Sequence, residues 1–214
     1  HLSAAQYFKK EFKLAQIGIG AGISEVQRAF KPVLGLPDKF PTDGSQFEYL
    51  FSDQETFIGG TIEGQVLFTP GHTPACVSYL IGDHLFTGDT LFLTDVGTGR
   101  CDFPGGSAIK LYQSVHEKLF QLPANTNVYV GHDYPPASRK MQFRTNIGEQ
   151  KAHNIHLNLN KSLSDYVQFR EARDKTLKPP ALLNQSLLLN LNAGVLPAPN
   201  AAGEFILGNG SSPK

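Results

Sequence analysis

Residues 65–74 read QVLFTPGHTP, an apolar run that ends in a turn carrying a histidine. The apolar run has the length and composition of a buried β-strand, and the proline and glycine after it end the strand. His72 therefore stands at a strand end. Gly71 lets the backbone approach its neighbours closely, and Pro74 biases Thr73 towards an extended conformation. We expect this turn to hold the imidazole of His72 in a fixed direction.

The same arrangement of strand, glycine and polar side chain occurs twice more. Residues 85–89 read LFTGD and place Asp89 after a strand, and residues 127–132 read NVYVGH and place His132 after another. Two imidazoles and one carboxylate are ligand types that zinc and ferrous iron accept. We therefore predict that His72, Asp89 and His132 contribute to one metal site.

The rest of the chain alternates between helical and strand patterns. Residues 57–92 contain three or four strands joined by turns, and residues 88–106 form a long glycine-rich loop of a kind that is often functional. Apolar spacing predicts helices over residues 2–13, 23–34, 109–122 and 164–177. Helices interleaved with mainly hairpin-connected strands predict a layered α/β sandwich. We expect a single domain over residues 1–214, with a loosely ordered tail from about residue 195.

The composition excludes several classes of protein. With 40% hydrophobic and 18% charged residues, the chain lies close to the average of folded domains and far from disordered proteins. The net charge is zero and no dense basic segment occurs, so we expect no nucleic-acid partner. No apolar run has the length of a membrane helix and no signal segment is visible, so we expect no membrane partner and a cytoplasmic location. Cys76 and Cys101 lack CxxC spacing and are expected to be small buried hydrophobes.

Several stretches together resemble the metallo-β-lactamase superfamily. They are residues 69–77 (TPGHTPACV), 86–92 (FTGDTLF), 99–106 (GRCDFPGG), 111–116 (LYQSVH) and 132–134 (HDY). Members of this superfamily hold metal at a sheet edge with a His-x-His-x-Asp-His loop, a later Gly-His-Thr, a Gly-Asp and a final Gly-His. His72, Asp89 and His132 match the later three positions, and His1 matches the last histidine of the first loop. The resemblance implies the αββα sandwich of the metallo-β-lactamase fold, and because the rest of the first loop is absent we expect the fold to be N-terminally incomplete.

Within the superfamily, the loop of residues 99–106 and the helix after it look like the branch of persulfide dioxygenases and bacterial β-lactamase-like hydrolases, with glyoxalase II as a neighbour. This resemblance implies a mononuclear non-haem iron enzyme that oxidises glutathione persulfide with O2 to sulfite and glutathione, a reaction of sulfide detoxification. His72, Asp89 and a histidine of the absent loop would hold Fe(2+), leaving open positions for a small thiol persulfide and O2. His132 and His1 would then no longer hold a metal, and would either support the iron ligands from outside or lie beside the substrate.

Three further residues acquire roles from this resemblance. The hydroxyl of Tyr134 would point at the thiol substrate or at bound oxygen. Arg100 would order the glycine-rich loop beside the metal through an ion pair with Asp102, or would be an ordinary solvated arginine.

Two other functions remain open. In a binuclear hydrolase of the glyoxalase II kind, His1, His132 and Asp89 would help to hold a second metal, typically zinc, and a bridging hydroxide would attack a thioester. Alternatively, the chain is an inactive fragment or a binding module, because the loop that supplies the first ligand is absent. A homodimer is left open beside a monomer, and His156 is expected to be structural or exposed.

Overall fold

The computed structural model describes residues 2–13 and 15–196. These residues form two compact units, one made of the residues up to Phe51 together with those from Leu177, and the other of Ser52–Thr176. Each unit is described by itself, so the single domain expected over residues 1–214 stays a prediction. The expected loose tail lies outside the described residues from residue 197 onward. In the part of the chain that is described, no helix is long and apolar enough to cross a membrane.

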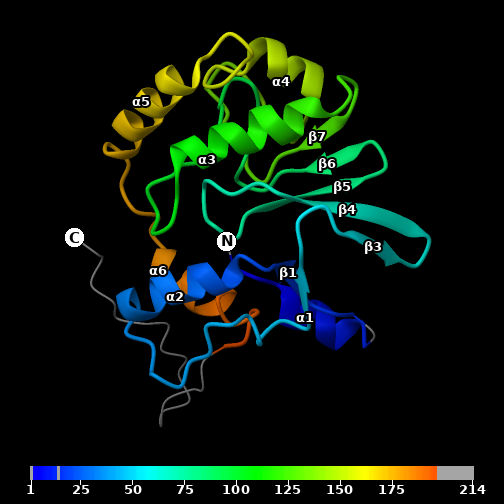
Figure 1. Cartoon of the computed structure of the whole chain (residues 1–214), viewed down its shortest axis with the longest axis vertical. Coiled ribbons are helices and arrows are strands. Elements are labelled where there is room, and N and C mark those ends of the chain that lie inside the picture. Colours follow the sequence, from blue (N-terminus) through cyan, green and yellow to red (C-terminus); the bar gives the residue numbers. More distant parts are fainter. Residues whose placement is uncertain (1, 14, 197–214) are drawn as a thin grey trace. The chain divides into compact units, whose positions relative to one another are not determined.

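The unit Ser52–Thr176 is built on a mixed sheet in the order β3-β4-β5-β6-β7-β8 (Figure 1). Its strands are β3 (Thr56–Gly59), β4 (Ile62–Phe68), β5 (Val77–Ile81), β6 (His84–Phe86), β7 (Asn127–Tyr129) and β8 (Arg144–Asn146). Neighbouring strands are antiparallel except for β6 and β7, which are parallel because the chain crosses over between them through a helix. Gly60 and Gly82, both with positive φ, form the tight turns before β4 and β6.

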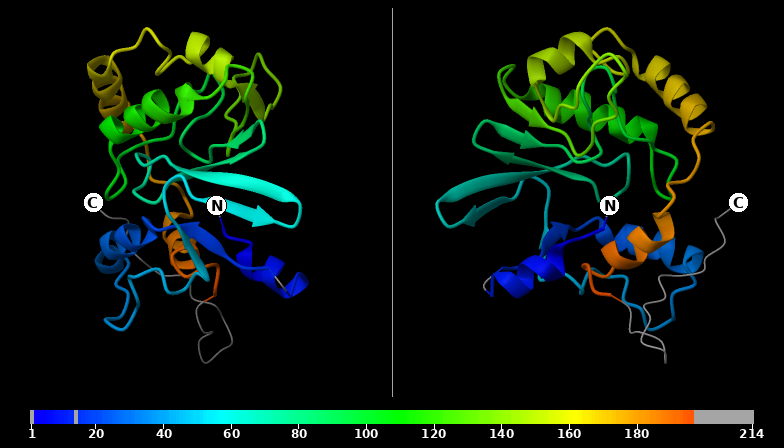
Figure 2. Two further views of the ribbon diagram at one scale, coloured as in Figure 1. Left: turned by 45° about the vertical axis from the view of Figure 1, so that its right-hand side comes forward. Right: turned by 180° about the vertical axis from the view of Figure 1, so that it is seen from behind.

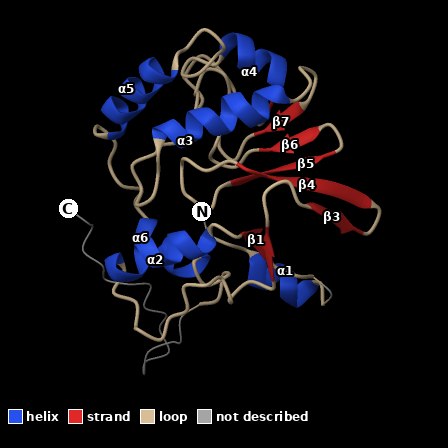
Figure 3. Ribbon diagram, in the orientation of Figure 1, coloured by secondary structure: helices blue, strands red, loops and turns tan. Residues whose placement is uncertain are grey.

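Helices cover one face of this sheet (Figures 2 and 3). They are α3 (Ala108–Gln113), which continues through a π-helical turn (Ser114–Lys118) and a 3-10 turn (Leu119–Gln121), then α4 (Ile147–His153) and α5 (Leu163–Asp174). Leu111 and Leu119 from the helical layer pack in one core with Leu85 and Val128 from the strands, and all four are fully buried. Each such side chain contributes roughly 2 kcal/mol through burial, so this core fixes the strand ends that follow Leu85 and Val128.

The other unit contains a small parallel sheet and three helices among the described residues. Its elements are α1 (Ala5–Glu11), β1 (Gly18–Gly20), α2 (Ile23–Val33), β2 (Tyr49–Phe51) and α6 (Leu183–Asn190), with β1 paired to β2. Gln27 on α2 is fully buried, and its side-chain amide donates to the carbonyl of Leu191 and accepts from the N–H of Gly44, at 3.0 and 2.9 Å. This buried amide joins the first part of the chain to the part that follows α6.

The α/β class expected from the sequence is confirmed as a mixed sheet flanked by helices. The segment of residues 88–106 is a long connection without helix or extended strand pairing apart from one bridge between Leu91 and Thr98, as expected. The sequence patterns missed β2, β8, α4 and α6. All four are short, and β8 reads Arg-Thr-Asn, which carries no apolar signal, so only its pairing with β7 defines it.

Candidate metal centre

The structure brings together the three residues that the sequence predicts as metal ligands. His72, Asp89 and His132 follow β4, β6 and β7, and the carboxylate of Asp89 lies between the two imidazoles. Its Oδ2 is 3.6 Å from Nε2 of His72, and its Oδ1 is 3.6 Å from Nε2 of His132. The two carboxylate oxygens therefore face different histidines.

The turns that carry Asp89 and His132 pack against each other. Gly131 donates its N–H to the carbonyl of Gly88 at 3.1 Å. A side chain at Gly131 would bring its Cβ within 2.9 Å of that carbonyl oxygen and 3.0 Å of Oδ1 of Asp89, and Gly88 has a φ of +50°. Gly131 is therefore needed by the packing of the two turns, because a larger side chain would force them apart, whereas Gly88 is favoured by its positive φ.

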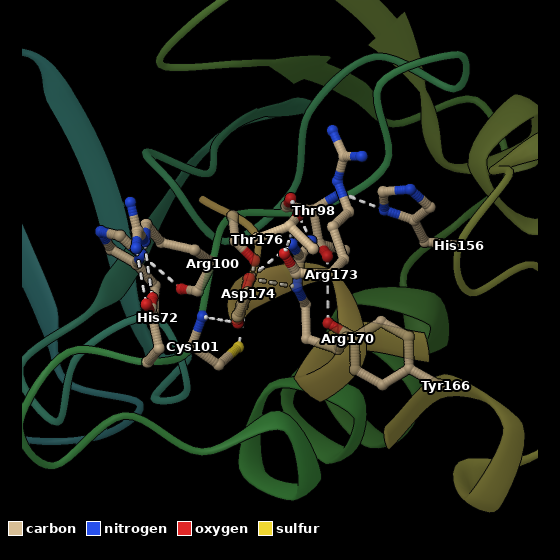
Figure 4. Close-up of polar contacts among 12 residues, drawn as sticks. His72, Thr98, Arg100, Cys101, His156, Tyr166, Arg170, Arg173, Asp174 and Thr176 are labelled. Atoms are coloured by element: carbon tan, nitrogen blue, oxygen red, sulfur yellow. Dashed lines mark hydrogen bonds and ion pairs between the residues drawn. The ribbon is translucent and has the colours of Figure 1, made fainter. Parts of the chain in front are cut away.

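A backbone carbonyl orients His72. Nδ1 of His72 lies 2.7 Å from the carbonyl oxygen of Arg100, so Nδ1 carries the proton and donates it (Figure 4). Nε2 is then the basic nitrogen, and it faces Asp89. The ring of Phe103 packs edge-on against the imidazole at 5.3 Å between centroids. A carbonyl on the far nitrogen of a histidine is the arrangement that fixes the tautomer of metal-binding imidazoles.

The ion pair expected on the glycine-rich loop is present. Arg100 donates to Asp102 through two parallel hydrogen bonds of 2.5 Å, and its guanidinium lies over the ring of Phe103 at 5.0 Å. The Arg100 guanidinium lowers the pKa of Asp102, and Asp102 raises the pKa of Arg100. The side chain of Arg100 is only 14% exposed, so it is not an ordinary solvated arginine. Phe103, which the sequence patterns did not single out, contacts both Arg100 and His72.

Tyr134 lies beside His132 at the open side of the site. The two rings are 5.3 Å apart, and Phe92 packs edge-on against Tyr134 at 5.9 Å. Partial burial, and after it the negative charge of Asp89, raise the pKa of the phenol, so Tyr134 is a neutral hydroxyl at pH 7. Because the residue is 60% exposed, its hydroxyl is accessible to a ligand from solvent.

An arginine that the sequence analysis missed fixes the segment after His132. Arg139 donates to both carboxylate oxygens of Asp133 at 2.8 Å, and to Asp95 at 2.7 and 3.0 Å. Asp133 also accepts the N–H of Gln142 at 2.7 Å, and its side chain is 3% exposed. These bonds join the His132 segment to the loop around Asp95. No local pattern predicts them, because Asp95 and Arg139 are 44 residues apart.

The donor types at the site suit a metal ion, but the set is incomplete. Within residues 2–13 and 15–196 there is no group of three or more His, Cys, Asp or Glu side chains that could hold a metal ion by itself. His72 with Asp89, and His132 with Asp89, each supply two of the imidazole and carboxylate ligands that zinc and iron accept. His1, predicted as a further ligand, lies outside the described residues. The metal-binding roles of these residues therefore stay predictions.

Both cysteines are free thiols. Burial raises the pKa of Cys101 to about 12 and also raises that of Cys76, so both thiols are protonated at pH 7. Cys101 is buried, as expected, whereas Cys76 is half-buried. A pocket of about 360 Å³ opens beside Cys101 and is also lined by Asp102, Ile109 and Lys175.

Comparisons with known proteins agree on one family. The model of the metallo-beta-lactamase superfamily matches residues 1–132. Glyoxylase B2 of Dictyostelium discoideum is 48% identical over 92% of this chain and 68% of its own length. A beta-lactamase hydrolase-like protein of Xylella fastidiosa is 44% identical over 97% of this chain, which spans about half (47%) of that protein.

A persulfide dioxygenase is also similar, at lower identity. Mitochondrial persulfide dioxygenase ETHE1 of Bos taurus is 32% identical over 73% of this chain and 58% of its own length. The crystal structure of ETHE1 from Myxococcus xanthus superimposes with a TM-score of 0.71, at 30% identity, over 91% of this chain and 73% of that one. The fold, the strand-end positions of His72, Asp89 and His132 and these matches agree: the chain belongs to the metallo-β-lactamase superfamily.

Proposed function

We propose that this chain carries most of the active site of a metal-dependent thioester hydrolase. The observation that supports this function is the position of Asp89, whose two oxygens each face a different histidine at 3.6 Å. A carboxylate placed in this way suits a bridge between two metal ions. In a mononuclear site, His132 would have no ligand role. Two of the relatives described above, at 48% and 44% identity, are named as a glyoxylase and a hydrolase-like protein.

The proposed ligands divide into two groups. His72 and Oδ2 of Asp89 would contribute to one ion, and His132 and Oδ1 of Asp89 to the other, together with His1. Bound metal ions would supply a nucleophilic hydroxide at neutral pH and polarise the carbonyl group under attack. In the overall reaction, water adds to the carbonyl carbon, the carbon–sulfur bond breaks, and the thiol leaves with a proton.

The remaining predicted residues bind and orient. Tyr134 presents a neutral, accessible hydroxyl beside His132 and is placed to donate a hydrogen bond to the sulfur or carbonyl of a small thiol ester. Arg100 and Asp102 act through the loop that they stiffen, because the carbonyl of Arg100 holds His72. Glutathione thioesters are the substrates that we expect, in keeping with the names of the glyoxalase-like relatives.

The second candidate is the persulfide dioxygenase. It is favoured by the structural match to ETHE1 from Myxococcus xanthus. In this case His72 and Asp89 would contribute to a single Fe(2+), and glutathione persulfide and O2 would be the substrates. The same residues serve both reactions, so activity decides between them.

Two assays on the same preparation test the proposal. Hydrolysis of a glutathione thioester is followed by release of the thiol, and O2 uptake is followed with glutathione persulfide. We expect hydrolysis, a loss of roughly 100-fold or more in kcat for Asp89→Asn, and a change within about twofold for the exposed control Glu63→Gln. O2 uptake without hydrolysis would replace the hydrolase by the dioxygenase.

A further inference from the structure

A buried ion pair lies on α5, close to the candidate metal centre. Arg170 donates to Oδ1 of Asp174 through Nε at 2.9 Å and through Nη2 at 2.5 Å, one helical turn along α5 (Figure 4). Arg170 is 2% exposed and Asp174 is 4% exposed. Two charges removed from water in this way need further partners, because their mutual attraction does not by itself offset the desolvation of both.

The further partners of both charges are backbone groups of the glycine-rich loop. Oδ2 of Asp174 accepts the N–H of Cys101 at 2.7 Å. Nη1 of Arg170 donates to the carbonyl oxygen of Thr98 at 3.3 Å. The ion pair therefore holds the loop on both sides of the dipeptide Gly99-Arg100.

The backbone of this dipeptide contacts two of the candidate ligands. The carbonyl of Arg100 accepts Nδ1–H of His72 at 2.7 Å. A Cβ built at Gly99 would lie 2.1 Å from the carbonyl oxygen of Asp89 and 3.4 Å from Nδ1 of His72, so the backbone passes directly against both residues. A shift of this backbone would move the acceptor that selects the tautomer of His72.

Thr98 is held by two more side chains. Its hydroxyl is 3.0 Å from the phenol oxygen of Tyr166, and its N–H donates to Nδ1 of His156 at 3.2 Å (Figure 4). Tyr166 is fully buried and His156 is 8% exposed. The Thr98 end of the dipeptide is thus fixed by several bonds, and Asp174 fixes the Cys101 end, so loss of Asp174 is expected to release the carbonyl of Arg100.

We propose that Arg170 and Asp174 are positioning residues for His72. They hold the carbonyl of Arg100 where it accepts the proton on Nδ1, so that Nε2 faces Asp89 and is the nitrogen available to a metal ion. The inference rests on the proposed metal site. The pair touches no substrate and acts only through the loop backbone.

The test reads the tautomer of His72 directly. Imidazole nitrogens of the ¹⁵N-labelled, metal-free full chain are recorded by NMR at pH 8, and His72 is assigned with His72→Gln. In the wild type we expect a proton on Nδ1, donated to the carbonyl of Arg100. A wild-type His72 without a proton on Nδ1 would overturn the proposal before any variant of the ion pair is made.

The variants then remove the pair. Arg170→Met with Asp174→Leu replaces both charges by apolar side chains and leaves no buried charge unpaired. We expect the fold to persist by circular dichroism, while the population of His72 that lacks a proton on Nδ1 rises. Asp174→Asn keeps the size of the side chain and serves as the second variant if the double variant does not fold. An unchanged tautomer in a folded variant would overturn the proposal.

A matched control and a second readout complete the design. Glu171→Gln with Arg173→Gln removes one charge of each sign from exposed positions of the same helix and should leave His72 unchanged. The affinity for Zn2+, measured by competition with a chelator, should fall about 10- to 100-fold in the double variant Arg170→Met/Asp174→Leu and not in the control. An equal affinity for Zn2+ in the double variant and in the control would contradict the positioning role. If no variant of the chain binds Zn2+, the proposed function fails while the tautomer result still stands or falls by itself.

Discussion

Thr98 donates its backbone N–H to Nδ1 of His156 at 3.2 Å, and this bond requires a neutral imidazole. Burial, and after it the positive charges of Arg170, Arg173 and Lys161, lower the pKa of His156 to about 4. The anchoring of Thr98 in the glycine-rich loop therefore depends on the protonation state of His156, which lies outside the candidate metal site.

The first prediction concerns stability in mild acid. Because the folded pKa of His156 lies below the unfolded value of 6.5, the unfolded chain binds the proton more readily, and the free energy of unfolding falls as pH drops from about 6.5 to about 4. At pH 4.5, His156 lowers the free energy of unfolding by roughly 2–3 kcal/mol relative to neutral pH. Urea unfolding of the wild type and of His156→Gln at pH 7.5 and pH 4.5 measures it. A variant with the same pH dependence as the wild type would refute the assignment.

The second prediction concerns Gly99. Its Cβ would lie 2.1 Å from the carbonyl oxygen of Asp89, so Gly99→Ala must displace backbone and should destabilise the chain by about 1–3 kcal/mol. Gly59, at the end of β3, has open space around its Cβ position, so Gly59→Ala is the matched control and should change stability by less than about 0.5 kcal/mol. Denaturant unfolding of both variants compares them. Equal stabilities would mean that the loop does not press against Asp89.

The third prediction concerns the segment after His132. Arg139 holds Asp133 and Asp95 by paired hydrogen bonds, so Arg139→Ala should loosen His132 and weaken binding of the second metal ion about 10- to 100-fold. Arg139→Lys keeps the positive charge but cannot make the paired hydrogen bonds. Its affinity for the second metal ion should therefore lie between those of the wild type and of Arg139→Ala. Titration with Zn2+ gives the affinities, and Arg144→Ala, at an exposed position of β8, is the control. Undiminished binding of the second metal ion in Arg139→Ala would show that His132 is positioned without the hydrogen bonds of Arg139.

The sequence predicted the candidate ligands because each carries a local signal. His72, Asp89 and His132 stand next to glycine and directly after an apolar strand, and strand ends of one sheet lie near each other. The hairpins from β3 to β6 were likewise visible in glycine turns and apolar runs. The long glycine-rich loop was found from its composition alone.

The residues that hold these ligands had no such signal. Arg139 and the pair of Arg170 and Asp174 read as polar residues of a loop and of the wet side of a helix, yet Arg170 and Asp174 are buried. Besides nearby carboxylates, their partners include a carboxylate and backbone groups 44 to 73 residues away, which no local pattern encodes. The crossover that makes β6 and β7 parallel is also a tertiary feature, set by packing of the helices on the sheet.

The helix predicted over residues 109–122 is present, but its winding differs from that of a regular α-helix. The structure has α3, then a π-helical and a 3-10 turn, over the same stretch. Periodicity marks the buried face, which includes Leu111, Val115 and Leu119, but it does not report how the helix winds.

The most direct test of the account is the number of metal ions bound per chain, measured by elemental analysis of the wild type and of His132→Gln. If Asp89 bridges two ions, the wild type holds two per chain and the variant holds one. One iron per chain in both proteins would contradict the binuclear centre and would favour the dioxygenase.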